Sequence, residues 1–318
     1  MSAITVSRAL RYPERVAAST REKIATAIEA VGYIPNLIAG GLASNSTRTI
    51  AAILPTLDNS IFTEVLQGMV DVLRPAGYQL ILGNSNYSLK EEESLIEAFL
   101  ARQVEGIMLT GACHTDRARH LLRTNPIPVV ETWSLPESPV DLNVGFSNHQ
   151  AAYEMTRYLI KKGHKQIGFV SAPTQNNDRS TQRRSGYRNA LHDAGLVVCR
   201  SLELESAFGL EYGGQALETL TRYHSGMSAI FFANDILATG ALLACQRRGW
   251  PVPERLAIAG FDDLEIASHI VPGLTTVRIY RREIGAEAGR LMLARIKNEE
   301  IVQPQLDLGF EIVSRESA

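Results

Sequence analysis

Acidic and amide side chains follow two apolar runs of the chain, and these residues are well suited to bind a polar ligand. Asn234 and Asp235 follow the run AIFFA, and Asp262 follows LAIAGF. If the runs are strands of an open α/β sheet, the residues after them lie where such sheets bind ligands. A carboxylate accepts hydrogen bonds from two neighbouring sugar hydroxyls, and an amide both donates and accepts. The other interpretation of the Asn-Asp pair is a helix N-cap.

Two earlier strand ends give a second group of candidates by the same rule. Asn59 and Phe62 follow the run ILP, and Glu131 and Trp133 follow PVV. An aromatic ring can stack on the face of a sugar, and it can equally belong to the core. The sequence therefore predicts a polar-ligand site whose walls come from several strand ends.

No catalytic motif accompanies these residues. The chain lacks GxxxxGK[ST], GxGxxG, GxSxG and HExxH, and its seven histidines are scattered. Cys113 stands beside His114, but adjacent residues rarely face each other, so the pair is interpreted as structural. Three cysteines without a CxxC pair indicate a reducing compartment and argue against disulfides and zinc. We expect no enzyme, no metal and no cofactor.

Length and composition indicate several globular units without a membrane span. A chain of 318 residues with 45% hydrophobic content suits two to three units with sizeable cores. No apolar run approaches the roughly 18 residues that a membrane span needs, and the N-terminus has no apolar signal segment. We expect a soluble, cytoplasmic protein.

The first 48 residues differ in charge from the rest. They carry six basic side chains against three acidic ones, an excess of three, while the whole chain has a net charge of −2, so the remainder sums to −5. A basic segment on an acidic body suggests a polyanion partner for that segment alone. Residues 2–10 are expected to form a short helix with Ser2 as N-cap. Ser19 and Glu22 fit a capping box for a second helix, which Gly32 would end.

Residues 33–44, with the sequence YIPNLIAGGLAS, join this segment to the body. Ile38 and Leu42 share a helical face, while Gly40 and Gly41 each cost about 1 kcal/mol relative to alanine. Such a segment can be disordered alone and helical once a partner orders it. The alternative is an ordinary interdomain linker.

In the body, short apolar runs alternate with amphipathic helices such as residues 62–73. The predicted strands are Ile50–Leu54, Tyr78–Leu82, Gly106–Leu109, Pro128–Val130, Gln166–Val170, Ala229–Phe232, Leu256–Ala259 and Thr275–Ile279. Alternation of this kind predicts βαβ units and parallel sheets. The predicted fold class is α/β, with two doubly wound lobes preceded by a helical head.

The phrases TVSRAL, STREKI and YIPNLIAGGLAS resemble the lactose-repressor (LacI/GalR) family of bacterial transcription regulators. The resemblance runs along the whole chain, and VGFSN, AIAGF and LDLGF are similar to the gluconate-utilisation repressors. It implies a periplasmic-binding-protein-like core whose chain crosses between lobes near Asn148, Tyr280 and Pro304. The implied domains are a head and hinge (1–47), an N-terminal lobe (48–148 plus 281–303) and a C-terminal lobe (149–280 plus 304–318).

The resemblance also assigns residues to DNA binding. The segment SAITVSRAL is similar to the family's recognition helix, and Leu42 matches the side chain that wedges into the minor groove. The residues implied to contact DNA are Ala3, Ile4, Thr5, Ser7, Arg8, Asn36, Ala39 and Leu42. Family members carry about a dozen further N-terminal residues that form a first helix. We therefore expect either a start codon upstream of Met1 or a truncated product that binds DNA poorly.

For the ligand, the resemblance implies that Arg183 in QRRSGY, Asp235 and Asp262 line an effector cleft. A guanidinium binds a carboxylate bidentately, which suits a sugar acid better than a neutral sugar. The expected function is a homodimeric, effector-responsive repressor that binds a palindromic operator and a sugar or sugar acid such as gluconate. Two alternatives stay open: a sugar-binding receptor that does not bind DNA, and a truncated, dimerising antagonist of a full-length repressor.

Overall fold

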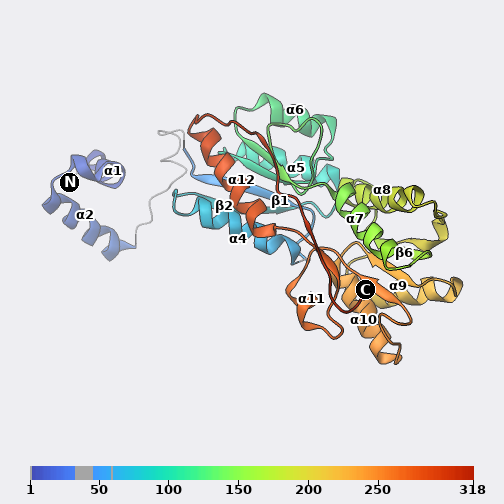
Figure 1. Cartoon of the computed structure of the whole chain (residues 1–318). Helices are drawn as coiled ribbons and strands as arrows, with labels where there is room; N and C mark the ends of the chain where they lie inside the picture. The colour runs from blue at the N-terminus through green and yellow to red at the C-terminus, as the bar shows by residue number, and fades with distance from the viewer. Residues whose placement is uncertain (1, 33–45, 59) are drawn as a thin grey trace. The chain divides into compact units, whose positions relative to one another are not determined.

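The computed structural model describes residues 2–32, 46–58 and 60–318. Its contacts divide the chain into two units, residues 1–47 and 48–318, and each is described by itself (Figure 1). Among the residues so described, no helix is both long and apolar enough to cross a membrane.

The first unit consists of short helices. α1 spans Ala3–Arg11, the 3-10 turn η1 spans Pro13–Arg15, and α2 spans Ala18–Val31. Ser2 caps α1 as predicted, because its Oγ accepts a hydrogen bond from Thr5 N at 3.3 Å. The predicted first helix is therefore confirmed with a shift of one residue.

The second helix ends as predicted but begins differently. Gly32 terminates α2 with a φ of 61°, a left-handed conformation that glycine adopts without strain. The predicted capping box is wrong, because Ala17 is the N-cap residue and no side chain caps the helix. Ala17 has a non-helical backbone conformation and the helix begins at Ala18. Ser19 and Glu22 therefore lie inside α2.

The N-terminal lobe of the second unit is built on a six-stranded parallel sheet. In spatial order its strands are β11 (Gln305–Asp307), β5 (Leu142–Gly145), β4 (Val129–Thr132), β3 (Ile107–Thr110), β1 (Thr49–Leu54) and β2 (Gln79–Asn84). β1 is buried on both faces, as expected for a strand of a covered parallel sheet. Ile50 and Ala52 point into one core cluster, while Ala51 and Ile53 point into another.

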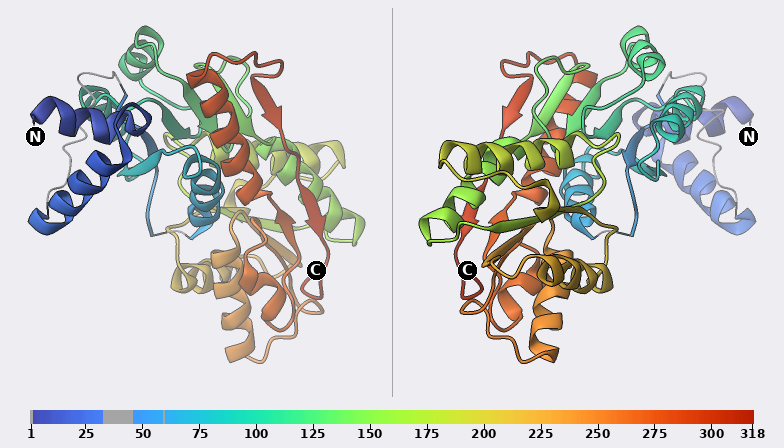
Figure 2. Two further views of the ribbon diagram at one scale, coloured as in Figure 1. Left: turned by 90° about the vertical axis from the view of Figure 1, so that its left-hand side faces the viewer. Right: turned by 90° about the vertical axis from the view of Figure 1, so that its right-hand side faces the viewer.

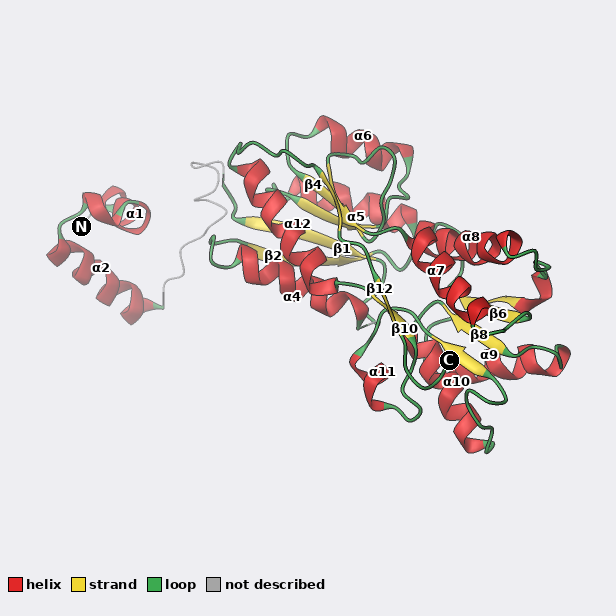
Figure 3. Ribbon diagram, in the orientation of Figure 1, coloured by secondary structure: helices red, strands yellow, loops and turns green. Residues whose placement is uncertain are grey.

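Helices cover both faces of this sheet (Figure 3). α4 (Ile61–Leu73) and α12 (Arg281–Ile296) share the core of Ile50, whereas α5 (Leu89–Ala101) and α6 (Asp116–Thr124) share the core of Ala51. α4 and α12 approach so closely that a Cβ on Gly285 would lie 1.8 Å from the carbonyl oxygen of Val65. These two helices therefore pack backbone against backbone.

The C-terminal lobe has a four-stranded parallel sheet. Its strands are, in spatial order, β7 (Glu203–Glu205), β6 (Ile167–Ser171), β8 (Ala229–Phe232) and β9 (Ala257–Ala259). Its helices are α7 (Asn148–Lys161), α8 (Asp178–Asp193), α9 (Leu210–Tyr223), α10 (Asp235–Arg247) and α11 (Glu265–His269). Phe169 and Tyr187 pack with α7 and α8 on one face, and Val170 and Leu217 pack with α9 and α10 on the other.

The last residues of the chain run from α12 back to the C-terminal lobe, where the terminus lies (Figure 2). On the way, Gln305–Asp307 pairs in parallel with β5 and is the edge strand β11 of the N-terminal lobe. This differs from the crossing expected near Pro304, because the chain leaves the first sheet only after Asp307. A short antiparallel pair, β10 (Thr276–Arg278) with β12 (Glu311–Val313), then follows.

The two-lobed arrangement of parallel sheets that the sequence predicts is confirmed. All eight predicted strands are present within one or two residues of their expected ends. The sequence analysis missed four short strands, namely β5, β7, β11 and β12. Three of these four contain only three residues each.

Candidate ligand site

Arg183 is a buried, positively charged side chain that lies between the two lobes. It projects from the first half of α8, whose start is capped by Asn177 through a hydrogen bond from Ser180 N at 3.2 Å. Its Nε donates to Asn148 Oδ1 and its Nη1 donates to the carbonyl oxygen of Ala233, each at 2.8 Å. Burial lowers the pKa of Arg183 to about 10, against the opposing effect of Asp262. The guanidinium is thus charged at neutral pH and bonded to neutral acceptors.

Asn234 and Asp262 lie together behind this guanidinium. Asn234 Nδ2 donates to Asp262 Oδ2 at 2.7 Å, and Asn234 Oδ1 accepts from Ile236 N at 2.9 Å. The N-cap interpretation of Asn234 is therefore confirmed, whereas its predicted contact with a ligand stays a prediction. Burial raises the pKa of Asp262 to about 6, although Arg183 counteracts the shift. Asp262 Oδ1 is buried without a hydrogen-bond partner in the described part of the chain.

Asp235 differs from this pair because both of its carboxylate oxygens are occupied. Oδ2 accepts from Leu264 N at 2.8 Å, and Oδ1 accepts from Thr276 Oγ1 at 2.6 Å. Burial, together with the charge of Asp262, raises the pKa of Asp235 well above its usual range. The structure therefore places Asp235 where it joins α10 to the loop after β9 and to strand β10, and not among the residues that line the cavity.

Phe62 and Trp133 line a small cavity between the lobes, together with Arg183 and Asn234. The cavity has a volume of about 30 Å³, close to the share of one water molecule. The two aromatic rings meet edge to face with centroids 5.3 Å apart. Trp133 Nε1 is buried and has no acceptor among the residues that the structure describes. Asn59, also predicted for this wall, lies outside the described residues.

Glu131 was expected in the same wall, but its side chain belongs to a buried cluster of the N-terminal lobe. Its Oε1 lies 3.2 Å from His114 Nε2, and its Oε2 accepts from Val140 N at 2.6 Å. His114 Nδ1 lies 2.5 Å from Glu92 Oε1 on the other side of the ring. Because its oxygens are taken by His114 and Val140, Glu131 does not line the interlobe cavity.

The protonation of this histidine cluster, defined as Glu92, His114 and Glu131, follows from its contacts. Burial alone would lower the pKa of His114, but hydrogen bonds to the two glutamates and their charges raise it to about 9. His114 is therefore an imidazolium at neutral pH, held between two carboxylates. Its side chain is only 1% exposed.

Several residues at the cavity were missed by the sequence analysis. Tyr87 from the loop after β2 stacks on Phe208 from the loop after β7, with ring centroids 6.1 Å apart. Both follow strand ends, so the rule that selected Phe62 also selects them. Arg281, at the start of α12, does not line the cavity but was missed as well: it donates to the carbonyl oxygen of Asp262 and pairs with Glu64 of α4 at 2.7 Å.

The start of α8 contacts the N-terminal lobe directly. Asp178 Oδ2 accepts from Ala112 N at 3.1 Å and from Ser134 Oγ at 2.8 Å. Arg179 Nη1 donates to the carbonyl oxygen of Thr110 at 3.1 Å. Gly111, next to Thr110, has a φ of 88°, a left-handed conformation that favours glycine, and a Cβ there would meet the guanidinium of Arg179. These contacts hold the lobes together around the small cavity.

The residues assigned to DNA contact lie partly within the described head. Ile4 is 71% exposed, and Arg8, one helical turn later, is exposed on the same face of α1. Thr5 Oγ1 lies 2.9 Å from Ser2 Oγ. Ala3 and Ser7 belong to α1, but their side chains lie outside the description, as do Asn36, Ala39 and Leu42 as whole residues.

The described ranges contain no group of three or more metal-ligating side chains arranged to hold an ion. What they contain is a buried, charged and partly unsatisfied polar region between two α/β lobes, together with a separate helical head. Two α/β lobes preceded by a short helical segment are the architecture that the sequence resemblance implies for a transcription regulator.

Comparison with known proteins identifies the family. Residues 1–36 match the model for bacterial regulatory proteins of the lacI family, and residues 156–318 match a periplasmic binding protein-like domain. The HTH-type transcriptional regulator GntR of Pseudomonas aeruginosa is 38% identical over 100% of this chain and 92% of its own length. The chain therefore belongs to the LacI family of bacterial transcription regulators and is not an enzyme.

Solved structures agree with this assignment. A LacI family transcriptional regulator from Silicibacter pomeroyi superposes with a TM-score of 0.93 at 30% identity, over 100% of this chain and 96% of that one. A complex of the transcriptional regulator CelR with cellobiose superposes with a TM-score of 0.75 at 27% identity, with the same coverage.

Proposed function

We propose that this regulator is a repressor that binds a pseudo-palindromic operator as a homodimer in the cytoplasm, and that a sugar acid such as gluconate controls it. The ligand would bind between the lobes, against Arg183. The observation that carries the proposal is a set of three buried polar atoms of this region that have no partner among the described residues, namely Asp262 Oδ1, Trp133 Nε1 and Arg281 Nε.

The unpartnered atoms match the chemistry of a polyol. Asp262 Oδ1 is an acceptor and Trp133 Nε1 is a donor, and a hydroxyl group can satisfy either kind of atom. Leaving such atoms buried and unpaired costs roughly 1–3 kcal/mol each. A ligand that satisfies them regains that free energy on binding. The bound cellobiose of CelR, a relative at 27% identity, is also a polyol.

Arg183 extends the match to an acidic ligand. Its hydrogen bonds go to the amide of Asn148 and the carbonyl of Ala233, which are neutral acceptors. A ligand carboxylate would replace them with a charge-assisted, bidentate contact. Asp262, with a pKa of about 6, offers only a partial counter-charge in weakly acidic solution.

A cavity of about 30 Å³ is too small for a sugar acid, so binding must change the interlobe contacts. The contacts of Asp178 and Arg179 with the N-terminal lobe are the ones that must yield or move. This requirement supports the expected coupling between ligand binding and lobe geometry. Coupling of about 1–3 kcal/mol is sufficient for regulation, and it is reciprocal between operator and ligand.

The ligand half of the proposal is tested by titration calorimetry with gluconate, using glucose as the neutral comparison. Arg183→Ala should weaken gluconate binding by roughly tenfold or more, the size of one lost charge-assisted hydrogen bond. The matched control is Arg247→Ala in α10, because Arg247 is exposed and no interaction of its side chain is found in the described residues. Equal affinity of the Arg183→Ala and unaltered chains would refute the ligand site.

The DNA half is tested by fluorescence anisotropy with a labelled palindromic duplex from upstream of the gene. The chain and a version extended by the upstream in-frame codons are compared, and binding should weaken steeply with salt. Leu42→Ala should weaken operator binding and leave gluconate affinity intact. Gluconate binding without any operator binding would favour the sugar receptor. If a full-length repressor binds the operator alone but loses this binding when it is mixed with this chain, the result would favour the antagonist.

A further inference from the structure

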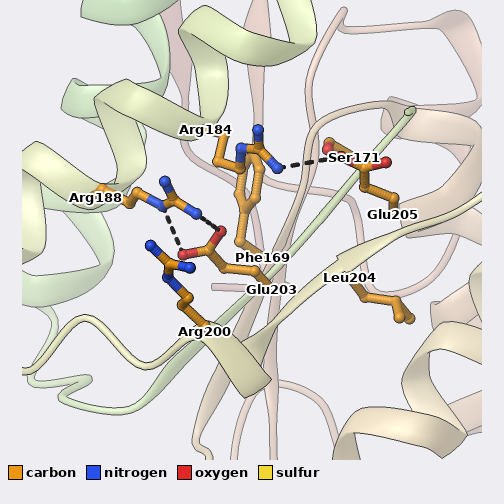
Figure 4. Close-up of a pocket in the computed structure, with 8 residues that line it drawn as sticks. All are labelled: Phe169, Ser171, Arg184, Arg188, Arg200, Glu203, Leu204 and Glu205. Atoms are coloured by element: carbon orange, nitrogen blue, oxygen red, sulfur yellow. Dashed lines mark hydrogen bonds and ion pairs between the residues drawn. The ribbon is translucent and has the colours of Figure 1, made fainter. Parts of the chain in front are cut away.

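A second cavity lies in the C-terminal lobe, and its lining residues differ from those of the interlobe cavity. It has a volume of about 300 Å³ and lies beside the edge strand β7 and helix α8 (Figure 4). Its polar lining residues are Ser171, Arg184, Arg188, Arg200, Glu203 and Glu205. None of these residues lines the interlobe cavity, so the two spaces are distinct.

Two of the three arginines are paired with strand β7. Arg188 donates to Glu203 through Nε at 2.8 Å and through Nη2 at 2.7 Å, a two-point contact. Arg184 Nη1 lies 3.1 Å from Glu205 Oε1. Arg184 and Arg188 are four residues apart on one face of α8, and Glu203 and Glu205 are two residues apart on one face of β7. The two ion pairs therefore lie side by side and hold β7 against α8; we call them the ladder.

Arg200 is not part of that ladder. In Figure 4 the Glu203 carboxylate is joined by dashed lines to Arg188, and no such line reaches Arg200. No hydrogen bond or ion pair of the Arg200 side chain is found among the described residues, and the residue is exposed. With three guanidiniums and two carboxylates, the lining therefore carries one positive charge in excess.

A purely structural ladder explains neither the third arginine nor the hollow next to it. Protein charges that line a cavity repel each other unless a counter-charge joins them. Guanidinium groups use planar N–H forks that match the oxygens of phosphate and carboxylate groups. A volume of about 300 Å³ lies at the lower end of the range of small-molecule sites, which suits a small metabolite.

We propose that this cavity binds the oxyanion group of a small metabolite, with Arg200 and the free edge of the Arg188 guanidinium as its donors. Arg184 and Ser171 lie at the other end of the lining and contact the remainder of the ligand. The site is separate from the ligand site between the lobes, and its test does not depend on whether gluconate binds there.

The proposal is tested with inorganic phosphate and with acetate as probes, at low ionic strength. The readout is the chemical shift of arginine Nε–H groups in the ¹⁵N-arginine-labelled chain. We expect a saturable shift of the Arg188 signal, with affinity weakened roughly tenfold or more in Arg200→Ala. Arg200 is exposed and unpartnered among the described residues, so the substitution leaves the core intact.

Arg247→Ala removes the same charge from the same lobe and serves as the control. Saturable binding that is lost in Arg200→Ala and retained in Arg247→Ala supports the site. Stronger binding of phosphate identifies a phosphate ester as the ligand class, and stronger binding of acetate identifies a carboxylate. Equal weakening by both substitutions, or no saturable shift with either probe, overturns the proposal.

Discussion

Each lobe contains a buried cluster of charged side chains, and the two clusters differ in how fully they are satisfied. In the N-terminal lobe, the imidazolium of His114 lies between Glu92 and Glu131. In the C-terminal lobe, Asp262 bonds to Asn234 through one oxygen and leaves the other without a partner among the described residues. In the first arrangement the charged groups contact one another, whereas in the second one carboxylate oxygen has no hydrogen-bond partner among the described residues.

The difference separates residues that stabilise a fold from residues that are available to a ligand. Removing one member of a complete buried cluster leaves charges without partners, which costs folding free energy. An incomplete cluster already bears that cost, and a ligand that completes it recovers the free energy on binding. Changes in the histidine cluster should therefore act on stability, and changes at Asp262 should act on binding.

The largest expected effect is that of His114→Ala. The substitution leaves Glu92 and Glu131 facing each other in a buried space, so we expect a loss of about 3–5 kcal/mol in the free energy of unfolding. Urea denaturation followed by circular dichroism measures it. Arg117→Ala is the control, because it breaks only the ion pairs of an exposed arginine with Glu93 and Glu97 and should change stability little. If His114→Ala were as stable as the unaltered chain, the cluster would not hold the lobe together.

The pH dependence of stability sharpens the same comparison. The pKa of His114 is raised in the folded state from 6.5 to about 9, so its protonated form stabilises the fold by about 3 kcal/mol. That contribution is complete below about pH 6.5 and is lost as the pH rises through 9. Unfolding measured from pH 6 to 9.5 should show this decline in the unaltered chain, and the decline should be absent from this window in His114→Ala.

The sequence predicted the architecture because the interior strands are short apolar runs whose burial on both faces is visible locally. Two of the strands that it missed, the ELE of β7 and the QLD of β11, have three residues each and carry charges. They are strands only because a neighbour pairs with them, β6 with β7 and β5 with β11. β11 also lies about 160 residues from its partner β5 in the chain, so no local pattern predicts the pairing.

The candidate site was predictable in part for a related reason. Strand ends selected Phe62, Trp133 and Asn234, which line the cavity between the lobes, and Asp262, which does not line it but bonds to Asn234. The same rule selected Glu131, whose carboxylate is taken by His114 and Val140 N. Whether a carboxylate is already satisfied depends on partners that tertiary packing supplies, and these cannot be read from the residues beside it.

Asp262→Asn should have a smaller effect, on binding and not on stability. Because burial raises the pKa of Asp262 to about 6, the folded state binds more protons than the unfolded state between about pH 4 and 6. The stability of the unaltered chain should fall as the pH rises through that window, and the variant should lack this fall and be no less stable at pH 8. The amide presents a donor in place of the free Oδ1 acceptor, so gluconate binding should weaken about tenfold.

Calorimetry at pH 8 and denaturation at pH 4 to 8 test both parts of this expectation. An Asp262→Asn variant that binds gluconate normally would remove the free carboxylate oxygen from the ligand site. A variant that unfolds as readily as His114→Ala would show that the two clusters have the same role after all.

The smallest expected effect separates Asp235 from Asp262. Thr276→Val keeps the shape of the side chain but removes the hydroxyl that donates to Asp235 Oδ1 at 2.6 Å. We expect a loss of about 1 kcal/mol in the free energy of unfolding and unchanged gluconate affinity, because the carboxylate of Asp235 is turned toward Thr276 and Leu264 N. Thr239→Val is the matched control: the buried Oγ1 of Thr239 has no partner in the described chain, so its removal should cost nothing. If Thr276→Val weakened gluconate binding as much as Asp262→Asn, Asp235 would act on the ligand, and the division between supporting and ligand-binding carboxylates would fail within the C-terminal lobe itself.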